Sequence, residues 1–335
     1  MYNKMMFTST LMIGTLIAIS SYSWMGMWMG LEINLLSLIP LMSETKNKMA
    51  SEAALKYFIT QALASTLLLF SFIMLSLSLP LSYAMSPYFL LILNTSLLTK
   101  MGAAPFHFWF PEVIEGLSWI NVAIMLTWQK IAPMVLIMFF NMTDLYLVLA
   151  ILASMIVSGC MGLNQVSLRK ILAYSSINHI GWMLGAMWFS ETVWTYYFIV
   201  YTLITLNILF IFKMLNIFFL NQLAISMNHD TVIKFFLLIN FLSLGGLPPF
   251  LGFFPKWITI QSLIAHGFFA VATLMILATL MTLYFYIRVT FSAILLSMEE
   301  TPHYSHKKIS NFLVLTLSSL SLSGLVLSTA IFNYL

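Results

Sequence analysis

Apolar residues follow one another in long runs along almost the whole chain, with short polar segments between them. A run of about 20 apolar residues is the length of helix that crosses the hydrocarbon core of a bilayer. Two of the runs are longer than one crossing and contain glycine and proline, which predicts a broken helix in each. The sequence thus predicts eleven transmembrane helices, near 4–22, 24–43, 52–79, 84–118 (broken), 119–138, 143–164, 168–189, 193–217, 232–266 (broken), 268–295 and 308–333.

Composition agrees with a protein dissolved in lipid. Of the 335 residues, 61% are hydrophobic and 7% are charged, whereas about 25% are charged in an ordinary soluble domain. The apolar runs recur from end to end, so we expect one all-α, polytopic membrane domain over residues 1–335. The first run starts by Met5 without an Arg-rich, Ser-rich leader, and we expect it to be a span of the mature protein.

The positive charges predict the orientation of the chain. Eleven crossings place every Lys and Arg outside the membrane core on the N-terminal side, and the opposite loops carry only Asp144 and Glu191. Lys and Arg accumulate on the cytoplasmic or matrix side of membrane proteins, so we expect the N-terminus there and the C-terminus on the far side. The residues on the N-terminal side are Lys4, Lys46, Lys48, Lys56, Arg169, Lys170, Lys213, Lys234, Arg288, Lys307 and Lys308.

Four charged residues fall inside the predicted spans: Glu32, Lys100, Lys130 and Lys256. Lys130 lies roughly 17 Å from the start of its span, at 1.5 Å per residue. Each such charge costs about 2.5 to 3.5 kcal/mol on an insertion scale. Pairing, internal water or neutralisation must therefore compensate them, and each of these produces a group that can exchange protons. The alternative is a static buried salt bridge that only holds helices together.

The two broken runs are copies of one pattern, 144 residues apart. Residues 102–112 and 246–256 both read G-x-x-P-F-x-x-x-F-P followed by a charge. We expect two inverted repeats, about 1–140 and 143–295, followed by the C-terminal helix 308–333. Each proline removes a backbone donor and frees a carbonyl that can hold water. The alternative is a helix kinked only for packing.

Other candidate groups carry weaker signals. Ser175, Ser176 and His179 share one helix face, which favours either a water wire or interhelical hydrogen bonds, and the pattern leaves both open. His107 is interpreted as support for the first bend. Glu299, Glu300, His303 and His306 occupy a loop that is interpreted as solvated rather than metal-binding, and Asn141 to Thr143 forms a sequon to which we assign no function. The single Cys160 excludes an intrachain disulfide and a cysteine-ligated iron–sulfur cluster.

Four segments together resemble subunit 2 of mitochondrial NADH:ubiquinone oxidoreductase, respiratory complex I. They are KMGAAPFHFWFPEV at 100–113, WQKIAP at 128–133, RKILAYSSINHIGW at 169–182 and GFFPKW at 252–257. The resemblance covers nearly the whole chain. The chain is rich in Met, Phe, Ile and Ser, and in this it is similar to the organelle-encoded insect form. Members outside animals usually have fourteen helices, so eleven resembles the animal form that lacks three at the N-terminus.

The resemblance implies a proton-translocating subunit of an antiporter-like family. It implies that Glu32 and Lys100 form a coupled pair, that Lys130 is the central relay lysine and that Lys256 is the lysine of the second broken helix. It also implies that NADH, FMN, iron–sulfur clusters and the quinone site belong to partner subunits, with no cofactor or metal in this chain. The expected location is the mitochondrial inner membrane, with the N-terminus in the matrix and the C-terminus in the intermembrane space.

The implied partners are the other membrane-arm and accessory subunits of complex I and membrane lipids, with no nucleic acid. Two other functions stay open at this point: a cation/proton antiporter subunit and a structural membrane scaffold. Neither G-x-G-x-x-G nor a Walker loop occurs in the sequence, so it contains no nucleotide fingerprint of its own.

Overall fold

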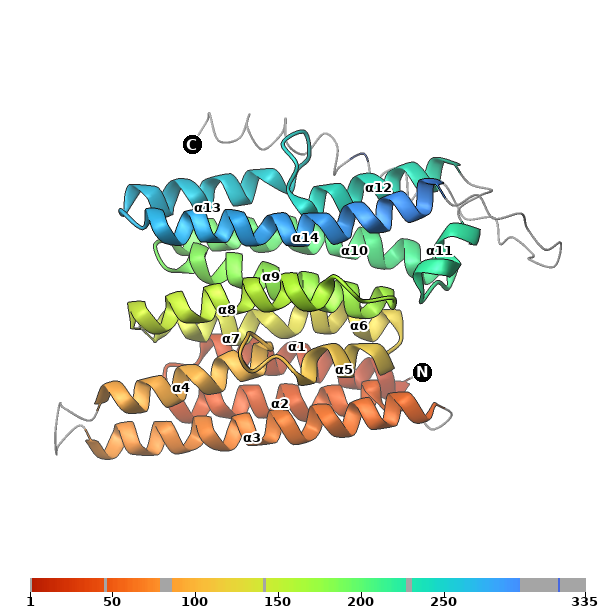
Figure 1. The fold of residues 1–335 in the computed structure, drawn as a ribbon. Helices are drawn as coiled ribbons and strands as arrows, with labels where there is room; N and C mark the ends of the chain where they lie inside the picture. Colours follow the sequence, from red (N-terminus) through yellow and green to blue (C-terminus); the bar gives the residue numbers. More distant parts are fainter. Residues whose placement is uncertain are drawn as a thin grey trace. The chain divides into compact units, whose positions relative to one another are not determined.

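The computed structural model of the protein describes residues 2–44, 47–78, 86–140, 143–226 and 231–295, and position 319. In this part of the chain the secondary structure consists of fourteen helices and one isolated bridge, between Ser167 and Phe219 (Figure 1). The helices are α1 (Tyr2–Ser20), α2 (Trp24–Met42), α3 (Lys48–Ser78), α4 (Ser86–Met101), α5 (Trp109–Gly116), α6 (Trp119–Leu126), α7 (Trp128–Phe139), α8 (Asp144–Gly162), α9 (Leu168–Met187), α10 (Glu191–Leu215), α11 (Leu220–Ser226), α12 (Thr231–Gly245), α13 (Phe253–Ala265) and α14 (Phe269–Leu295).

Several expectations fall outside the described residues. They are the helix at 308–333, the loop that carries Glu299, Glu300, His303 and His306, and the first two residues of the sequon at 141–143.

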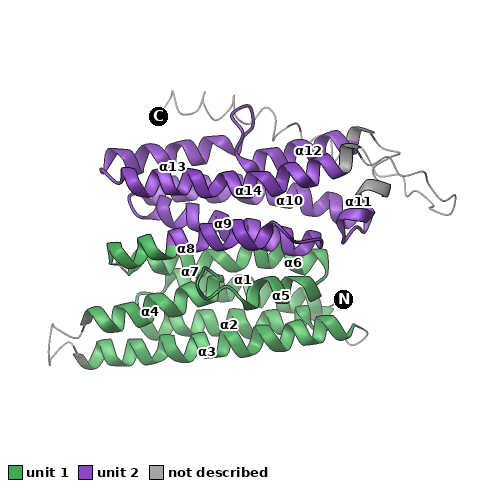
Figure 2. Ribbon diagram, viewed as in Figure 1, with its two compact units in different colours: residues 1–150 green, residues 151–335 purple. Residues whose placement is uncertain are grey.

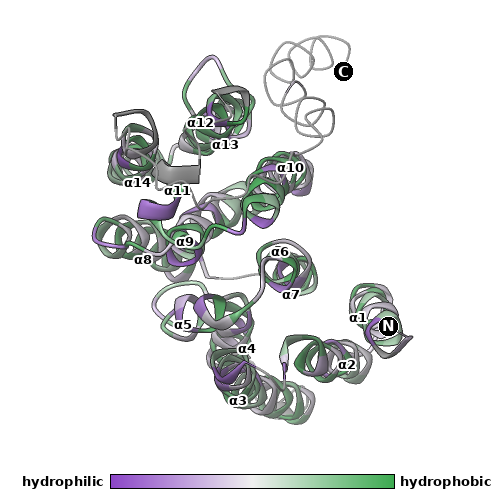
Figure 3. Ribbon diagram, turned by 90° about the vertical axis from the view of Figure 1, so that its right-hand side faces the viewer, coloured by the Kyte–Doolittle hydropathy of each residue, from purple (hydrophilic) through white to green (hydrophobic). Residues whose placement is uncertain are grey.

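The chain divides into two compact units, residues 1–150 and residues 151–335 (Figure 2). The first unit contains α1 to α7 and the first residues of α8, and the second contains the rest of α8 and α9 to α14. Six helical stretches in the described residues are long and apolar enough to cross a membrane. Apolar residues run along the helices throughout (Figure 3). Large apolar side chains such as Leu16, Leu63 and Leu77 are exposed on their surfaces, as expected where lipid replaces water.

Each broken helix lies beside one long continuous helix of its own unit. In the first unit α3 packs along both α4 and α5, and in the second α14 packs along both α12 and α13 (Figure 1). The 31 residues of α3 span roughly 46 Å at 1.5 Å per residue, which is long enough to cross a membrane. The two halves of the broken helix beside it therefore together make one membrane crossing. This confirms that the predicted runs at 84–118 and 232–266 are broken helices.

Two local features depart from the predicted helices. The span at 119–139 is interrupted at Thr127, whose hydroxyl donates to the carbonyl of Ala123 at 2.6 Å. The backbone N–H of Thr127 donates to the same carbonyl at 3.1 Å, and a similar threonine bond lies within the continuous α10, from Thr205 to Tyr201, so the hydroxyl alone does not explain the interruption. The short helix α11 was not predicted, because seven residues are too few for a periodic pattern. The count of eleven crossings stays a prediction, since the last expected span lies outside the described residues.

Candidate functional site

The first break is made by a glycine that ends a helix. The helix α4 ends at Met101 and the chain becomes helical again at Trp109, the first residue of α5. Between them Gly102 adopts the left-handed conformation, with φ 75°. Its N–H donates to the carbonyl of Thr99 at 3.2 Å, and the next N–H donates to that of Leu98 at 3.1 Å. These two bonds form the Schellman motif, a common helix C-terminus.

The second break repeats this geometry at positions 144 residues later. The helix α12 ends at Gly245, α13 begins at Phe253, and Gly246 between them has φ 79°. The N–H of Gly246 donates to Ser243 at 3.0 Å, and the next N–H donates to Leu242 at 3.4 Å. Both breaks are therefore built by the same local rule.

The glycines, rather than the prolines, end the two helices. From the sequence we expected Pro105 and Pro249 to free carbonyls by removing donors from a continuous helix. Instead, each helix has already stopped three or four residues earlier, at a glycine whose backbone most other residues rarely adopt. The carbonyls of the last turn are free because nothing helical follows them. The carbonyl of Gly245, which Pro249 was expected to free, is available at the end of α12 for this different reason.

Different side chains cover the free carbonyls at the two breaks. The carbonyl of Lys100 accepts a hydrogen bond from the Gln61 side-chain amide at 3.4 Å. The equivalent carbonyl of Leu244 accepts from the Lys256 ammonium at 3.1 Å, and that of Gly245 accepts from the same ammonium at 2.9 Å. The first helix end is thus covered by a neutral amide and the second by a cation. A cation suits the negative end of a helix dipole.

Glu32 and Lys100 lie in the first unit and interact without forming an ion pair. Lys100 is 8% exposed, at the end of α4, and Glu32 lies in α2. The Glu32 carboxylate acts electrostatically on Lys100 and on the buried hydroxyl of Tyr57. Its Oε2 atom is buried and accepts no hydrogen bond from the described residues. No ion pair within 4.0 Å joins Glu32 to Lys100 in this part of the chain, so the structure holds the two charges apart.

Lys130 is the most deeply buried of the candidate lysines, with 1% of its surface exposed. It lies in α7, and its ammonium is 5.9 Å from the centre of the Phe110 ring, which α5 supplies. The face of an aromatic ring attracts a cation at this distance. Beside it, the Gln129 amide donates to Asn34 Oδ1 in α2 at 2.9 Å. A polar link therefore joins the helix of Lys130 to the helix of Glu32.

Lys256 lies in the second unit and is 6% exposed. Besides its two bonds to the end of α12, its ammonium lies 5.8 Å from the centre of the Trp182 ring in α9. The predicted site residues are thus divided between the units: Glu32, Lys100 and Lys130 belong to the first, and His179 and Lys256 to the second.

A polar cluster surrounds His179. The hydroxyl of Tyr197 lies 2.8 Å from His179 Nδ1, and the ring of Tyr201 is centred 5.0 Å from the imidazole. Ser176, in the same stripe of α9, hydrogen-bonds to Tyr201. The predicted polar stripe is therefore buried. Ser176 and His179 face tyrosines of α10, and Ser175 lies close to the hydroxyl of Tyr286 in α14.

These tyrosines were not predicted, although the sequence repeat contains a signal for one of them. Tyr57 and Tyr201 stand 144 residues apart, and both are buried. Tyr197 has no counterpart of its own type, because Ala53 occupies the position 144 residues earlier. A comparison at the repeat offset would therefore have identified Tyr57 and Tyr201 and not Tyr197.

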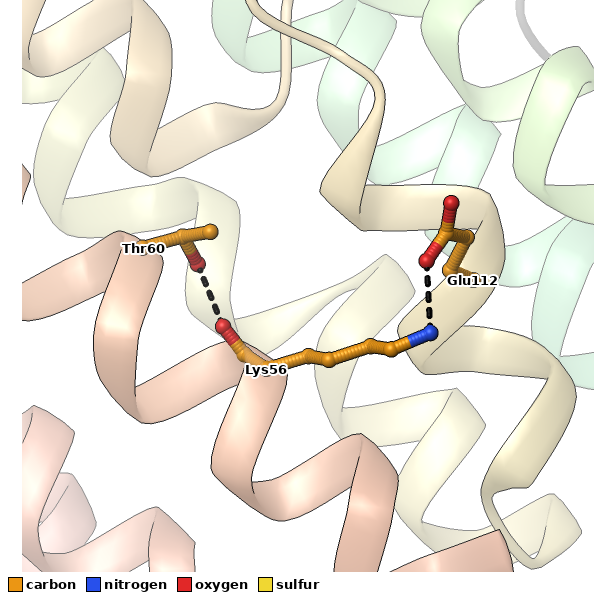
Figure 4. Close-up of polar contacts among 3 residues, drawn as sticks. All are labelled: Lys56, Thr60 and Glu112. Atoms are coloured by element: carbon orange, nitrogen blue, oxygen red, sulfur yellow. Dashed lines mark hydrogen bonds and ion pairs between the residues drawn. The ribbon is translucent and has the colours of Figure 1, made fainter.

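An ion pair outside the buried clusters was also missed. Lys56 of α3 and Glu112 of α5 are 2.7 Å apart, and their side chains are 53% and 56% exposed (Figure 4). Glu112 occupies the repeat position of Lys256. The carboxylate at the first break thus points outward to α3, whereas the ammonium at the second turns inward to its own broken helix.

The described residues contain no cluster of side chains suited to a metal ion. His107 lies within the first break, where its Nδ1 is 3.2 Å from the carbonyl of Pro105. It is buried and contacts the ring of Phe108. These local contacts agree with its interpretation as support for the bend.

Comparison with known proteins places this fold among antiporter-like membrane subunits. The family described as NADH:quinone oxidoreductase/Mrp antiporter matches residues 21–282, and the chain belongs to it. Proteins named NADH-ubiquinone oxidoreductase chain 2 are 46% identical to it in Locusta migratoria, over 331 residues, and in Anopheles gambiae, over 332 residues. Each alignment covers 97% of both chains. Within the antiporter family, the chain belongs to the NADH-ubiquinone oxidoreductase chain 2 family, as its motifs predicted.

Two solved structures have the same fold. A chain of respiratory complex I from Thermus thermophilus with bound aureothin aligns with a TM-score of 0.86 and 25% identity, over 96% of this chain and 78% of that one. A chain of the Mrp complex from Dietzia aligns with a TM-score of 0.78 and 19% identity, over 90% and 62%. The second likeness concerns the fold alone.

Proposed function

We propose that this chain carries protons through the membrane arm of NADH:ubiquinone oxidoreductase by a relay of Glu32, Lys100, Lys130, His179 and Lys256. One observation carries the proposal: three lysines are at least nine-tenths buried within apolar helices, and two of them lie at broken helix ends. A buried ammonium is expensive in a membrane. Such residues are most simply explained by a proton pathway.

Glu32 and Lys100 serve as the switch of this relay. An ionised Glu32 stabilises a charged Lys100 through the electrostatic interaction between them. Because no ion pair locks them together, a small movement of α2 or α4 changes this interaction. Withdrawal of Glu32 weakens the hold on the Lys100 proton, which then passes toward Lys130.

Water completes the relay between the fixed groups. Asn94 and Asn240, in the first halves of the two broken helices, are fully buried, and neither side-chain amide has a protein hydrogen-bond partner in the described residues. Buried amides of this kind are usually satisfied by internal water. Such water beside α4 and α12 would connect the lysines, and His179 with Tyr197 would extend the path into α9.

The relay explains why no cofactor is expected in this chain. Proton transfer between carboxylate, ammonium, imidazole and water needs no redox group, so NADH, FMN, iron–sulfur clusters and the quinone belong to partner subunits. The chain would lie in the mitochondrial inner membrane among the other membrane-arm subunits, with its N-terminus in the matrix and its C-terminus in the intermembrane space. We further propose that residues 1–140 and 143–295 are inverted repeats, since their breaks share one local geometry.

Replacement of Lys100 with Met in the assembled complex tests the relay. Methionine keeps the length of the side chain and removes the proton, and the loss of one acid–base group slows its step by roughly 100-fold or more. We expect fewer protons pumped per NADH oxidised. Lys213→Met is the matched control, because Lys213 is exposed in the last turn of α10.

The outcome also separates the alternatives. A complex that pumps normally with Lys100→Met would indicate a structural scaffold. An isolated chain that exchanges cations for protons, and that does not co-purify with NADH oxidation, would indicate an antiporter subunit.

A further inference from the structure

Lys256 is held by the backbone of a helix end. Its ammonium donates to the carbonyls of Leu244 and Gly245, the last two residues of α12, at 3.1 and 2.9 Å. These carbonyls lack helical donors and carry the negative end of the helix dipole. The two bonds therefore supply both acceptors and a partial counter-charge.

No acidic side chain takes part in this arrangement. Within the described residues, Lys256 forms no ion pair within 4.0 Å, and no carboxylate acts on it electrostatically. Lys100 differs, since the charge of Glu32 reaches it. The ammonium of Lys256 must be positioned by uncharged groups.

Gly246 provides the space that the ammonium occupies. A Cβ atom at this position would lie 2.8 Å from Lys256 Cδ and 2.9 Å from Lys256 Nζ. Any residue other than glycine would therefore push the lysine away from the helix end. The glycine ends α12 and also leaves room for the lysine that caps it.

Trp182 bounds the ammonium on another side. Its ring centre is 5.8 Å from Lys256 Nζ, and the indole itself is buried. Trp182 stands three residues after His179 in α9, on nearly the same helix face. The ring thus lies one helix turn from the polar cluster around His179.

We propose that Gly246 and Trp182 are positioning residues that hold the Lys256 ammonium against the end of α12. The arrangement of Gly246, Trp182 and the two carbonyls, here called the lysine seat, replaces a counter-carboxylate. It fixes the position of the Lys256 ammonium between proton transfers. This inference rests on the proposed relay.

The first break contains no such seat. A Cβ atom on Gly102 would meet the ring and Cβ of Phe110, at 3.0 Å and beyond, rather than a lysine. The residue at the repeat position of Lys256 is Glu112, which pairs with Lys56 instead. Gly267 has a left-handed backbone like that of Gly246 and nothing within 4 Å of its Cβ position, so it provides a control that separates backbone strain from displacement of the ammonium.

Two substitutions at Trp182 test the aromatic side of the seat. Trp182→Phe keeps an aromatic face, and Trp182→Leu removes it while staying apolar. A desolvated cation–π contact changes an equilibrium by up to about 30-fold. In the assembled complex we expect Trp182→Leu to lower the protons pumped per NADH clearly, and Trp182→Phe to restore most of the loss. Equal pumping in the two variants would overturn the role of the ring.

The pair Gly246→Ala and Gly267→Ala tests the other side. Both glycines have a left-handed backbone, so both variants carry similar backbone strain, and only the first displaces Lys256. We expect Gly246→Ala to reduce pumping per NADH more than Gly267→Ala, in complexes with matched assembly. The double variant Gly246→Ala with Trp182→Leu should lose less pumping per NADH than the two single fold-losses multiplied together, because both substitutions act on one ammonium.

The controls distinguish failure of the seat from failure of the relay. The proposal of the lysine seat would be wrong, and the relay intact, if Lys100→Met lowered pumping while the losses in the double variant were multiplicative or Trp182→Leu pumped fully. If Lys100→Met pumped normally, the relay itself would be wrong. Should Gly246→Ala fail to assemble, the Trp182 pair alone decides the question.

Discussion

The three buried lysines differ in what stabilises their positive charge. Lys100 interacts with the carboxylate of Glu32, Lys130 lies over the ring of Phe110, and Lys256 caps a helix end. A carboxylate, an aromatic face and two carbonyls hold a cation with different strengths. The three lysines are therefore contacted by groups of different chemical kinds.

His179 is the residue whose role the sequence left open between relay and packing. Its Nδ1 contacts the hydroxyl of Tyr197, and removal of that hydroxyl separates the two roles. We expect Tyr197→Phe to slow proton translocation by roughly 10-fold or more. The loss of one hydrogen bond should change stability by only about 1 kcal/mol.

Proton translocation and thermal stability of the complex are the two measurements. Tyr196→Phe is the matched control, because Tyr196 is the neighbouring tyrosine of α10 and is 39% exposed. If Tyr197→Phe changed stability alone and left translocation intact, His179 would be a packing residue.

At the scale of elements, the broken helices depend on close approach of their backbones. The carbonyl oxygen of Ser243 in α12 lies 1.7 Å from where a Cβ atom on Gly252 would stand. Gly252 has an ordinary φ of −66°, so it is required for space rather than for its conformation. The second half-helix can start beside the first only if this position lacks a side chain.

Gly252→Ala should therefore destabilise the second break severely, by about 4 kcal/mol or more, through overlap with backbone that has no room to move. Gly267→Ala is the control, since Gly267 has φ 84° and nothing within 4 Å of its Cβ position. The control should cost only about 1 to 2 kcal/mol of backbone strain. The midpoint of thermal unfolding of the assembled complex measures both, and equal losses would contradict the close-approach account.

The ends of the helices were predicted well from the sequence where a single physical rule, the cost of exposing polar backbone to lipid, determines them. Long apolar runs placed α1, α2, α8 and α10 within about two residues of their observed ends, because the cost of exposing polar backbone to lipid fixes such spans. The breaks were located through the repeat of glycine and proline. The interruption at Thr127 was missed, since the apolar run continues across it without a glycine or proline at that position.

The candidate site was predicted in part, for an equally physical reason. Charges inside apolar runs are anomalous in any fold, so the four buried charges could be identified from the sequence alone. The groups that contact Lys100, Lys256 and His179 could not. Gln61, Trp182 and Tyr197 are ordinary residues of a membrane helix until three-dimensional packing brings them close. Contacts between distant segments are set by packing rather than by local pattern.

At the scale of the whole molecule, the distribution of charge predicts an orientation that labelling can test. Cys160 is exposed and would react itself, so it is first replaced by serine. Lys4→Cys and Glu191→Cys then place one thiol on each predicted side. In mitochondria whose outer membrane is opened, a membrane-impermeant maleimide should label Glu191→Cys and leave Lys4→Cys unlabelled until the inner membrane is permeabilised. The reverse pattern would invert the topology.

The central claim is that buried charges in this chain carry the protons which the complex pumps, and Lys130 tests it most directly. It is 1% exposed within α7, and the other predicted relay lysines flank it in the proposed path. The deciding measurement is the number of protons pumped per NADH oxidised by vesicles containing complexes with Lys130→Met, beside complexes with Lys213→Met. The account predicts a clear fall for Lys130→Met, with the Lys213→Met control equal to the parent. An unchanged ratio in a fully assembled Lys130→Met complex would contradict it.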